Sequence, residues 1–437
     1  MPDTLRDALR EARQASGMPF RKFALQAGFS ESHLRSVENG HRAVTGDVAA
    51  AYDRVLDTGG AFALALSRPG DPAGPGAGVP LAWDQAGTLA VLSGLASGGD
   101  VERRSFVTAS GITLTMAAAR WRSALPAPGP TPGTGARQVP PALVERIEQR
   151  LEHLRHLDDE AGSGSLARLA RGELGFIARL LRDATYSGHT AARLYSLAAE
   201  ASRQAAWDYF DQGQHAIAGR YFDTALRASA TAGDPVVGAY ALSFMAVQSY
   251  STGRPQDAVS LLETARDATA RLGSARMTAM LAARQARAVS KTGSRRACAR
   301  LLNQARDALD AGPRDTDPAV LYWVTYGEVE MIAASSALDL GEPAQAVRCF
   351  DAAIAADYRG DDQYPRSHAI YLARAAEAHL ALRDLDASLD RAAHAVRCLG
   401  GVDSARSASA ITGLRAKLKP HAASPRVRDF LEATRRA

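Results

Sequence analysis

PFRKFALQAGFSESHLRSVENGHRAV, residues 19–44, carries the clearest fold signal of this 437-residue chain. Pro19 can open a helix because the first helical positions need no backbone N–H donor, and Gly28 breaks that helix. Ser30 is a preferred N-cap residue and predicts the start of a second helix, which Asn39-Gly40 ends. The stretch therefore predicts two short helices joined by a turn that contains glycine. The positions at which these helices must touch are Ala24, Ala27, Leu34 and Val37.

A helix, a short turn and a second helix form the arrangement that lets one helix brace another in the major groove of DNA. The stretch resembles the DNA-binding domain of lambda-repressor and Cro-like (XRE) regulators, and we assign residues 1–67 to this domain. The resemblance implies an all-α fold, double-stranded DNA as a partner and a bacterial transcription regulator. The residues that carry it are Phe23-Ala24, Ala27-Gly28-Phe29-Ser30, Leu34, Val37-Glu38-Asn39-Gly40 and Arg42.

The same resemblance implies which side chains contact DNA. Glu31 can accept a hydrogen bond from a cytosine amino group, whereas serine hydroxyls can bond to several bases. The residues expected to reach base edges are Ser30, Glu31, Ser32 and Ser36. The residues expected to contact phosphates and fix the register are Arg21, Lys22, Arg35 and Arg42. An ordinary solvated helix surface is the alternative for each of them, and a helical hairpin that contacts protein is the alternative for the whole stretch.

The charge of this first domain predicts weak binding by a single copy. Residues 1–66 hold eight basic and eight acidic side chains, whereas a phosphate-binding domain is usually basic. Phe20 also stands where the resembling regulators usually have a glutamine that touches phosphate. We therefore expect a homodimer.

Two stretches rich in Pro and Gly predict linkers: RPGDPAGPGAGVP at 68–80 and PAPGPTPGTGARQVPP at 126–141. They divide the chain into a helix-turn-helix domain (1–67), linkers with a connector (68–141) and a helical region (142–437). In the connector, Arg103-Arg104 before an apolar run looks like a twin-arginine export signal. Such signals act at a free N-terminus, and a DNA-binding domain has no use outside the cell, so we expect a coincidence and a cytoplasmic protein.

From residue 142 onward, recurring turns predict helical repeats. The turns are anchored at Gly213, Gly253, Gly293, Gly341 and Arg383, with steps of 40, 40, 48 and 42 residues. Small residues stand five and twelve positions after each anchor, a larger one stands nine after most anchors, and alanine stands seven before each. This pattern resembles the tetratricopeptide repeat and implies a solenoid of helix pairs. A non-repeating helical bundle is the alternative.

In such a solenoid, the first helix of each pair lines a concave face that can hold a ligand. By repeat phase, the lining positions are 13, 10, 6 and 3 residues before each anchor. They are Glu200, Arg203, Trp207, Phe210, Tyr240, Ser243, Val247, Tyr250, Met280, Ala283, Arg287, Ser290, Glu328, Met331, Ser335 and Leu338. Aromatic and arginine side chains suit a ligand with an apolar part and a carboxylate. The residues predicted to contact a small molecule or peptide are Arg203, Trp207, Tyr240, Tyr250, Arg287 and Glu328.

Two points bear on this ligand. A buried guanidinium needs a partner, so an anionic ligand or an acidic residue such as Glu200 or Glu328 should accompany Arg203 and Arg287. Asparagine, the usual clamp on a peptide backbone in the resembling family, occurs only at Asn39 and Asn303, which argues against standard peptide capture. The alternative is that the groove only closes on a neighbouring helix.

Composition and motifs exclude several other functions. The chain has a net charge of +5 and three cysteines without short spacing, so it predicts neither a disulfide framework nor a zinc site. It has no apolar run of the roughly 20 residues that a membrane span needs, and no phosphate-binding loop, nucleophile elbow or zinc-protease motif. We expect no enzyme, cofactor, metal or membrane contact. The sequence predicts a DNA-binding regulator whose repeats sense a ligand or mediate dimerisation, with an interaction scaffold whose head binds protein as the alternative.

Overall fold

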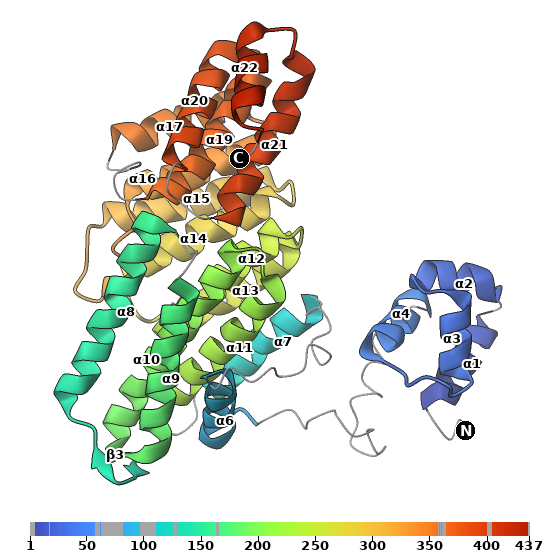
Figure 1. Ribbon diagram of the computed structural model, residues 1–437, viewed down its shortest axis with the longest axis vertical. Helices are drawn as coiled ribbons and strands as arrows, with labels where there is room; N and C mark the ends of the chain where they lie inside the picture. Colours follow the sequence, from blue (N-terminus) through green and yellow to red (C-terminus); the bar gives the residue numbers. More distant parts are fainter. Residues whose placement is uncertain are drawn as a thin grey trace. The chain divides into compact units, whose positions relative to one another are not determined.

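The structure is a computed structural model that describes residues 5–16, 18–56, 62, 82–96, 111–125, 129–162, 166–356, 358, 360, 364–399 and 404–435. The predicted linker at 68–80 and the Arg103-Arg104 pair lie outside the described residues. The chain divides into two compact units, residues 1–79 and 80–437. Helices make up nearly all of the described structure, so the predicted all-α fold class is confirmed (Figure 1).

The first unit contains helices that pack around one small core. Its helices are α1 (Leu5–Ala15), α2 (Phe20–Ala27), α3 (Glu31–Glu38) and α4 (Gly46–Leu56). Leu9, Phe23, Val48 and Tyr52 are fully buried in this core. The positions at which α2 and α3 were predicted to touch, Ala24, Ala27, Leu34 and Val37, are buried as well. Residues 19–44 therefore form the two helices that their sequence predicts.

The second unit is an array of paired helices, in which each pair consists of two neighbours in sequence (Figure 1). The pairs are α10 (Gly188–Asp211) with α11 (His215–Ala232), α12 (Pro235–Ser251) with α13 (Pro255–Thr269), α14 (Ala275–Ser290) with α15 (Arg295–Asp310), α16 (Tyr326–Asp339) with α17 (Pro343–Ala355), and α19 (Pro365–Ala381) with α20 (Leu385–Cys398). The array resembles a helical repeat rather than an irregular bundle.

Every predicted anchor lies in the turn inside one of these pairs. The four anchor glycines have φ between 75° and 81°, a left-handed conformation that glycine adopts without steric cost. Arg383, the fifth anchor, has φ of 64°. The positions 7 before and 5, 9 and 12 after each anchor are all buried, with relative exposures of 9% or less. The repeat pattern in the sequence therefore marks the contacts between paired helices.

Further helices extend this array or cover it. They are α6 (Gln85–Ala96), α7 (Gly111–Ala124), α8 (Pro141–Ala161), α9 (Leu166–Asp183), α21 (Ala405–Leu418) and α22 (Pro425–Ala433), with short 3-10 helices η1 (Ala319–Leu321) and η2 (Lys419–His421). The helix α7 packs on α11 and α13 through the buried Trp121, whose Nε1 donates to Ser229 Oγ at 3.0 Å. Gly238 leaves the room for that ring, because a Cβ there would lie 2.4 Å from it. The predicted connector thus supplies two helices, α6 and α7, to the second unit.

Residues 129–141, the described part of the second predicted linker, differ from what their composition predicts. They include two short strands, β1 (Gly133–Thr134) and β2 (Arg137–Gln138), which flank β3 (Ala184–Tyr186) in the order β1-β3-β2. The strand β1 pairs antiparallel and β2 parallel with β3. A Cβ on Gly135 would lie 2.0 Å from the carbonyl oxygen of Asp183. Glycine is needed here for close backbone approach, not for flexibility.

Candidate functional site

Local backbone chemistry sets the angle between α2 and α3 in the first unit. Gly28 has φ of 78°, so the chain reverses at the end of α2 without steric cost. The Oγ atom of Ser30 then accepts a hydrogen bond from the backbone N–H of His33 at 3.2 Å and caps α3. After α3, Gly40 also has φ of 78°. Gly28 and Ser30 therefore define the start of α3, and Gly40 defines the turn that follows its end.

Glu38, at the end of α3, ties this helix to the rest of the unit. Its carboxylate is nearly buried and accepts two hydrogen bonds from Arg13, at 2.6 and 2.8 Å, and one from the Tyr52 hydroxyl at 2.6 Å. Arg10 donates to its backbone oxygen at 2.8 Å. Burial and the neighbouring carboxylate raise the pKa of Tyr52 well above its usual value, so its hydroxyl stays a donor. Glu38 therefore orients α3 on the unit.

The exposed face of α3 holds most of the side chains predicted to contact DNA. Ser32 and Arg35 are exposed, and Arg35 Nη2 lies 2.7 Å from Glu31 Oε1. The hydroxyl of Ser36 donates to the backbone oxygen of Ser32 at 2.9 Å, and Ser30 is occupied as the N-cap. In the protein without DNA, the predicted base readers are therefore held by the helix or by Arg35.

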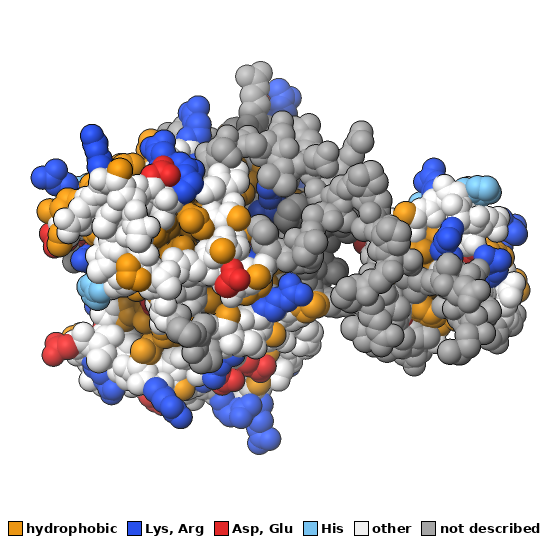
Figure 2. Space-filling model, turned by 90° about the horizontal axis from the view of Figure 1, so that it is seen from below, with side chains coloured by type: hydrophobic (Ala, Val, Ile, Leu, Met, Phe, Trp, Pro, Cys, Tyr) orange, Lys and Arg blue, Asp and Glu red, His pale blue; other side chains and the backbone are white. Residues whose placement is uncertain are grey.

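The predicted phosphate contacts surround α3. Arg21 and Lys22 are exposed in the first turn of α2, and Arg42 follows α3 and hydrogen-bonds to the imidazole of His33 at 3.1 Å. The ring of Phe20 lies 4.3 Å from the guanidinium carbon of Arg13 and 4.4 Å from that of Arg35. Phe20 therefore positions Arg35 by a cation–π contact. Lys and Arg side chains are scattered over the visible face of this unit rather than gathered in one patch (Figure 2).

The second unit contains a cavity of about 480 Å³ on the inner side of the paired helices. The six residues predicted to contact a ligand all line it: Arg203, Trp207, Tyr240, Tyr250, Arg287 and Glu328. They come from the first helices of four successive pairs, α10, α12, α14 and α16. The structure thus brings together side chains that are up to 125 positions apart in sequence, as 328 minus 203 shows.

One of the four predicted lining positions is displaced by one residue: the position nine before each anchor lines the cavity more often than the position ten before. Gln204, Phe244, Arg284 and Ile332, nine residues before their anchors, line the cavity. Of the residues ten before the anchors only Arg203 does, and Ser243, Ala283 and Met331 are buried elsewhere. The other predicted positions that do not line it are Glu200, Phe210, Met280, Ser290, Ser335 and Leu338. Positions one apart differ by only 100° around a helix, so repeat phase alone does not separate them.

Arg203 has the acidic partner that its burial requires. It forms two hydrogen bonds of 2.9 Å with Glu200, which also accepts from Arg155 at 3.1 Å and from Gln204 at 2.9 Å. Burial alone would raise the pKa of Glu200, but these donors outweigh it and the pKa falls to about 2. Glu200, one of the two acidic partners considered, therefore neutralises Arg203.

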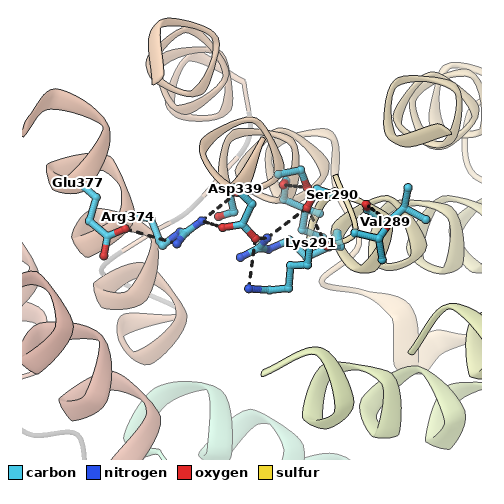
Figure 3. Close-up of polar contacts among 11 residues, drawn as sticks. Val289, Ser290, Lys291, Asp339, Arg374 and Glu377 are labelled. Carbon is cyan, nitrogen blue, oxygen red and sulfur yellow. Dashed lines mark hydrogen bonds and ion pairs between the residues drawn. The ribbon is translucent and has the colours of Figure 1, made fainter. Parts of the chain in front are cut away.

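Arg287 is also paired, although with a carboxylate that was not predicted. It binds Asp339, which additionally contacts Arg374 and, at 3.2 Å, Lys291. Figure 3 shows Arg374 between Asp339 and Glu377, so the ion pairs join α14, α16 and α19. Burial opposes ionisation of Asp339, but Arg287 and Arg374 outweigh it and hold its pKa well below the usual range.

The helix α8 closes part of the concave face. Arg366 of α19 makes two hydrogen bonds, of 2.6 and 2.8 Å, to Asp158 of α8 across 208 residues of sequence. The hydroxyl of Tyr322 donates to Asp159, also in α8. The groove therefore does close on a neighbouring helix, and a cavity remains beneath it.

Two carboxyl groups in the cavity wall titrate near neutral pH. Burial raises the pKa of Asp159 to about 7 and the pKa of Glu328 to about 7, although Tyr322 and Tyr371 donate hydrogen bonds to them. Tyr322 and Trp323 belong to the longest step between anchors, the one of 48 residues, and both line the cavity. Extra residues in one repeat therefore supply cavity wall that the repeat pattern does not reveal.

A separate cluster has the chemistry to hold a metal ion. The nitrogen and sulfur atoms of His368, His394 and Cys398 lie within 4.8 Å of one another, on α19 and α20. Imidazole and thiolate are ligands that zinc prefers. Sequence spacing did not indicate this group, because His368 lies on a different helix from the other two.

Three further findings relate the chain to known classes of protein. Within the described part of the chain, no helix combines the length and the apolar character needed to cross a bilayer. No curated protein matches the chain. Residues 4–65, which span α1 to α4, match the family model of the helix-turn-helix domain. The first unit is thus similar to helix-turn-helix DNA-binding domains, and this similarity suggests a DNA-binding regulator.

Proposed function

We propose that this protein is a transcription regulator that binds double-stranded DNA, with α3 in the major groove. The observation that carries this proposal is the arrangement of α2 and α3. Glu38 and the buried contacts fix α3 on the unit, while Ser32 and Arg35 stay exposed on its outer face. A fixed helix with a polar outer face is what a groove-binding helix requires.

The ion pair between Glu31 and Arg35 can be exchanged for DNA contacts at little cost. The Arg35 side chain is 58% exposed and the Glu31 side chain 39%, and a solvent-accessible pair four residues apart on a helix contributes only about 0.3–0.5 kcal/mol. On DNA, Arg35 turns to a phosphate and Glu31 becomes free to accept from a cytosine amino group. Arg21, Lys22 and Arg42 add phosphate contacts on both sides of α3.

A homodimer on an inverted repeat is part of the proposal. One neutral unit with short polar readers offers few specific contacts, and two units on half-sites about 34–36 Å apart double them. Light scattering of the chain with and without DNA tests this point. A monomer under both conditions would remove the dimer from the proposal.

We further infer that the second unit, which resembles tetratricopeptide arrays, senses a small molecule or peptide in its cavity. The charge balance of the first unit also supports the competing class, an interaction scaffold whose head binds a protein. The test is a band-shift assay of the full chain on the DNA upstream of its own gene, with an unrelated duplex as competitor. Sequence-preferring binding supports the regulator, and equal or absent binding supports the scaffold.

A further inference from the structure

Arg284, in the middle of α14, is a buried cation of the cavity wall. Its relative exposure is 8%. One guanidinium nitrogen, Nη1, donates to Ser243 Oγ at 2.5 Å. The rings of Phe244 and Trp323 lie 4.3 and 4.9 Å from its guanidinium carbon. Trp323 is itself held by a hydrogen bond of 3.1 Å to the Tyr240 hydroxyl, so this aromatic surround is fixed.

Arg284 differs from the other cavity arginines in having no carboxylate partner among the described residues. Arg155 and Arg203 pair with Glu200, and Arg287 pairs with Asp339. The two remaining arginines of the wall, Arg366 and Arg406, pair with Asp158 and Asp211. A guanidinium removed from water without a counter-charge is costly, and aromatic rings and one hydroxyl offset only part of that cost. An anionic ligand in the cavity, which Arg284 lines, can supply the ion-pair partner that the wall does not place in contact with it.

Asp208, in α10, is the opposite case in the same cavity. It is 3% exposed and forms no hydrogen bond or ion pair with another described residue through its side chain. The charges that act on the pKa of Asp208 are those of Asp158, Arg366, Arg203 and Asp211, whereas Glu328 is the carboxyl group that acts on the pKa of Arg284. Arg284 and Asp208 thus line the same cavity but are influenced by different charged groups. The cavity therefore offers a guanidinium without an ion-pair partner and a carboxyl group without a hydrogen-bond partner among the described residues.

We propose that this cavity binds a small organic acid whose carboxylate or phosphate group is held by Arg284 and whose hydroxyl or ammonium group is held by Asp208. The rings of Phe244, Trp323 and Trp207, which line the same space, then pack on the body of the molecule. A volume of about 480 Å³ lies in the range of small-molecule sites. This inference rests on the proposed sensing role of the second unit and names the chemical class that it senses.

Binding measurements on the full chain test the proposal. The probes are 4-hydroxybenzoate, benzoate and phenyl phosphate, with neutral 4-hydroxybenzamide and a capped tri-alanine peptide for comparison. Quenching of tryptophan fluorescence reports occupancy because Trp207 and Trp323 line the cavity, and the rise in melting temperature gives a second readout. We expect at least one acid to bind saturably and the amide to bind at least about tenfold more weakly. Comparison of benzoate with phenyl phosphate shows which anionic group fits.

Four variants assign the contacts. Arg284→Met should weaken binding of the acids about ten- to hundredfold, whereas Arg300→Met, on the exposed face of α15, should leave it unchanged. Asp208→Ala should weaken 4-hydroxybenzoate more than benzoate, because only the former carries the hydroxyl. Since Arg284 has no ion-pair partner, its replacement by Met should keep or raise the melting temperature without a probe. If that variant fails to fold, Arg284→Lys keeps the charge and should still weaken binding, because lysine lacks the planar fork.

The proposal fails if none of the acids binds, if the amide or the peptide binds as well as the acids, or if Arg284→Met and Arg284→Lys leave affinity unchanged. These measurements need no DNA. Acid binding without DNA binding would preserve this site and remove the regulator role, whereas DNA binding without acid binding would do the reverse.

Discussion

The guanidinium of Arg35 lies 2.7 Å from the carboxylate of Glu31 on the outer face of α3. Arg35→Ala and Arg42→Ala should each weaken binding to all DNA sequences and reduce its salt dependence, because each removes a phosphate contact. Glu31→Ala should change the preference between sequences and, by freeing Arg35, raise affinity for unrelated DNA. Fluorescence anisotropy at several salt concentrations measures both effects, with Arg300→Ala as the charge-matched control. If none of the three substitutions changes the affinity for DNA, its salt dependence or the sequence preference, the DNA-binding assignment is contradicted.

Glu38 should be essential to the fold of the first unit. Glu38→Gln breaks a nearly buried pair with Arg13 and weakens the bond from Tyr52, so we expect a loss of at least about 2 kcal/mol in the stability of this unit. Glu31→Gln, which breaks only an exposed pair, should cost about 0.5 kcal/mol or less. Hydrogen exchange of the amides in α1 to α4 reports the change for this unit separately. Equal protection in the two variants would refute the structural role of Glu38.

Arg383 is a strained anchor in the array of helix pairs. With φ of 64° it occupies a region that costs a side-chain-bearing residue about 1–2 kcal/mol, part of which is offset by the larger entropy of glycine when unfolded. Arg383→Gly should therefore raise the stability of the second unit by up to about 1 kcal/mol. Gly253→Arg, at a turn with open space around the Cβ position, should lower it by a similar amount. A melting temperature that falls in Arg383→Gly would show that its side chain contributes more than the strain.

The buried carboxyl of Glu328 should make stability fall as pH rises. Burial raises its pKa from 4.5 to about 7, so between these values the folded chain holds a proton that the unfolded chain has released. The free energy of unfolding then decreases with rising pH across that window. We expect Glu328→Gln to lose less melting temperature than the wild type between about pH 5 and about pH 8. Identical pH profiles would mean that Glu328 is already ionised at pH 5.

Helix ends and turns, which depend on the backbone preferences of single residues, could be predicted from the sequence. Gly28, Ser30 and Gly40 define α3 through their own backbone preferences, and the anchors of the helix pairs follow from left-handed turns and small buried residues. Features that depend on distant contacts could not. The partner of Arg287 is Asp339, 52 positions away, and the pair between Asp158 and Arg366 spans 208.

Two errors have specific causes. Glycine and proline at 133–141 have the composition of a linker, but a glycine at 135 also permits the approach of two backbones, and composition does not distinguish these uses. Arg284 was missed because its position differs by one residue from the assumed lining phase. The sequence also does not distinguish an arginine on the surface from one that is buried without an ion-pair partner.

In an open array, each repeat contacts only the repeats next to it, so the array can unfold stepwise from either end. The contact of α8 with α19 changes this behaviour, because it fastens a helix before the first pair to the fifth pair. Loss of the terminal pairs then also breaks the hydrogen bonds between Arg366 and Asp158, so the intervening pairs should separate together with them. The second unit should consequently unfold as one cooperative block, and a molecule that stabilises any pair between α8 and α19 should delay the unfolding of the whole unit.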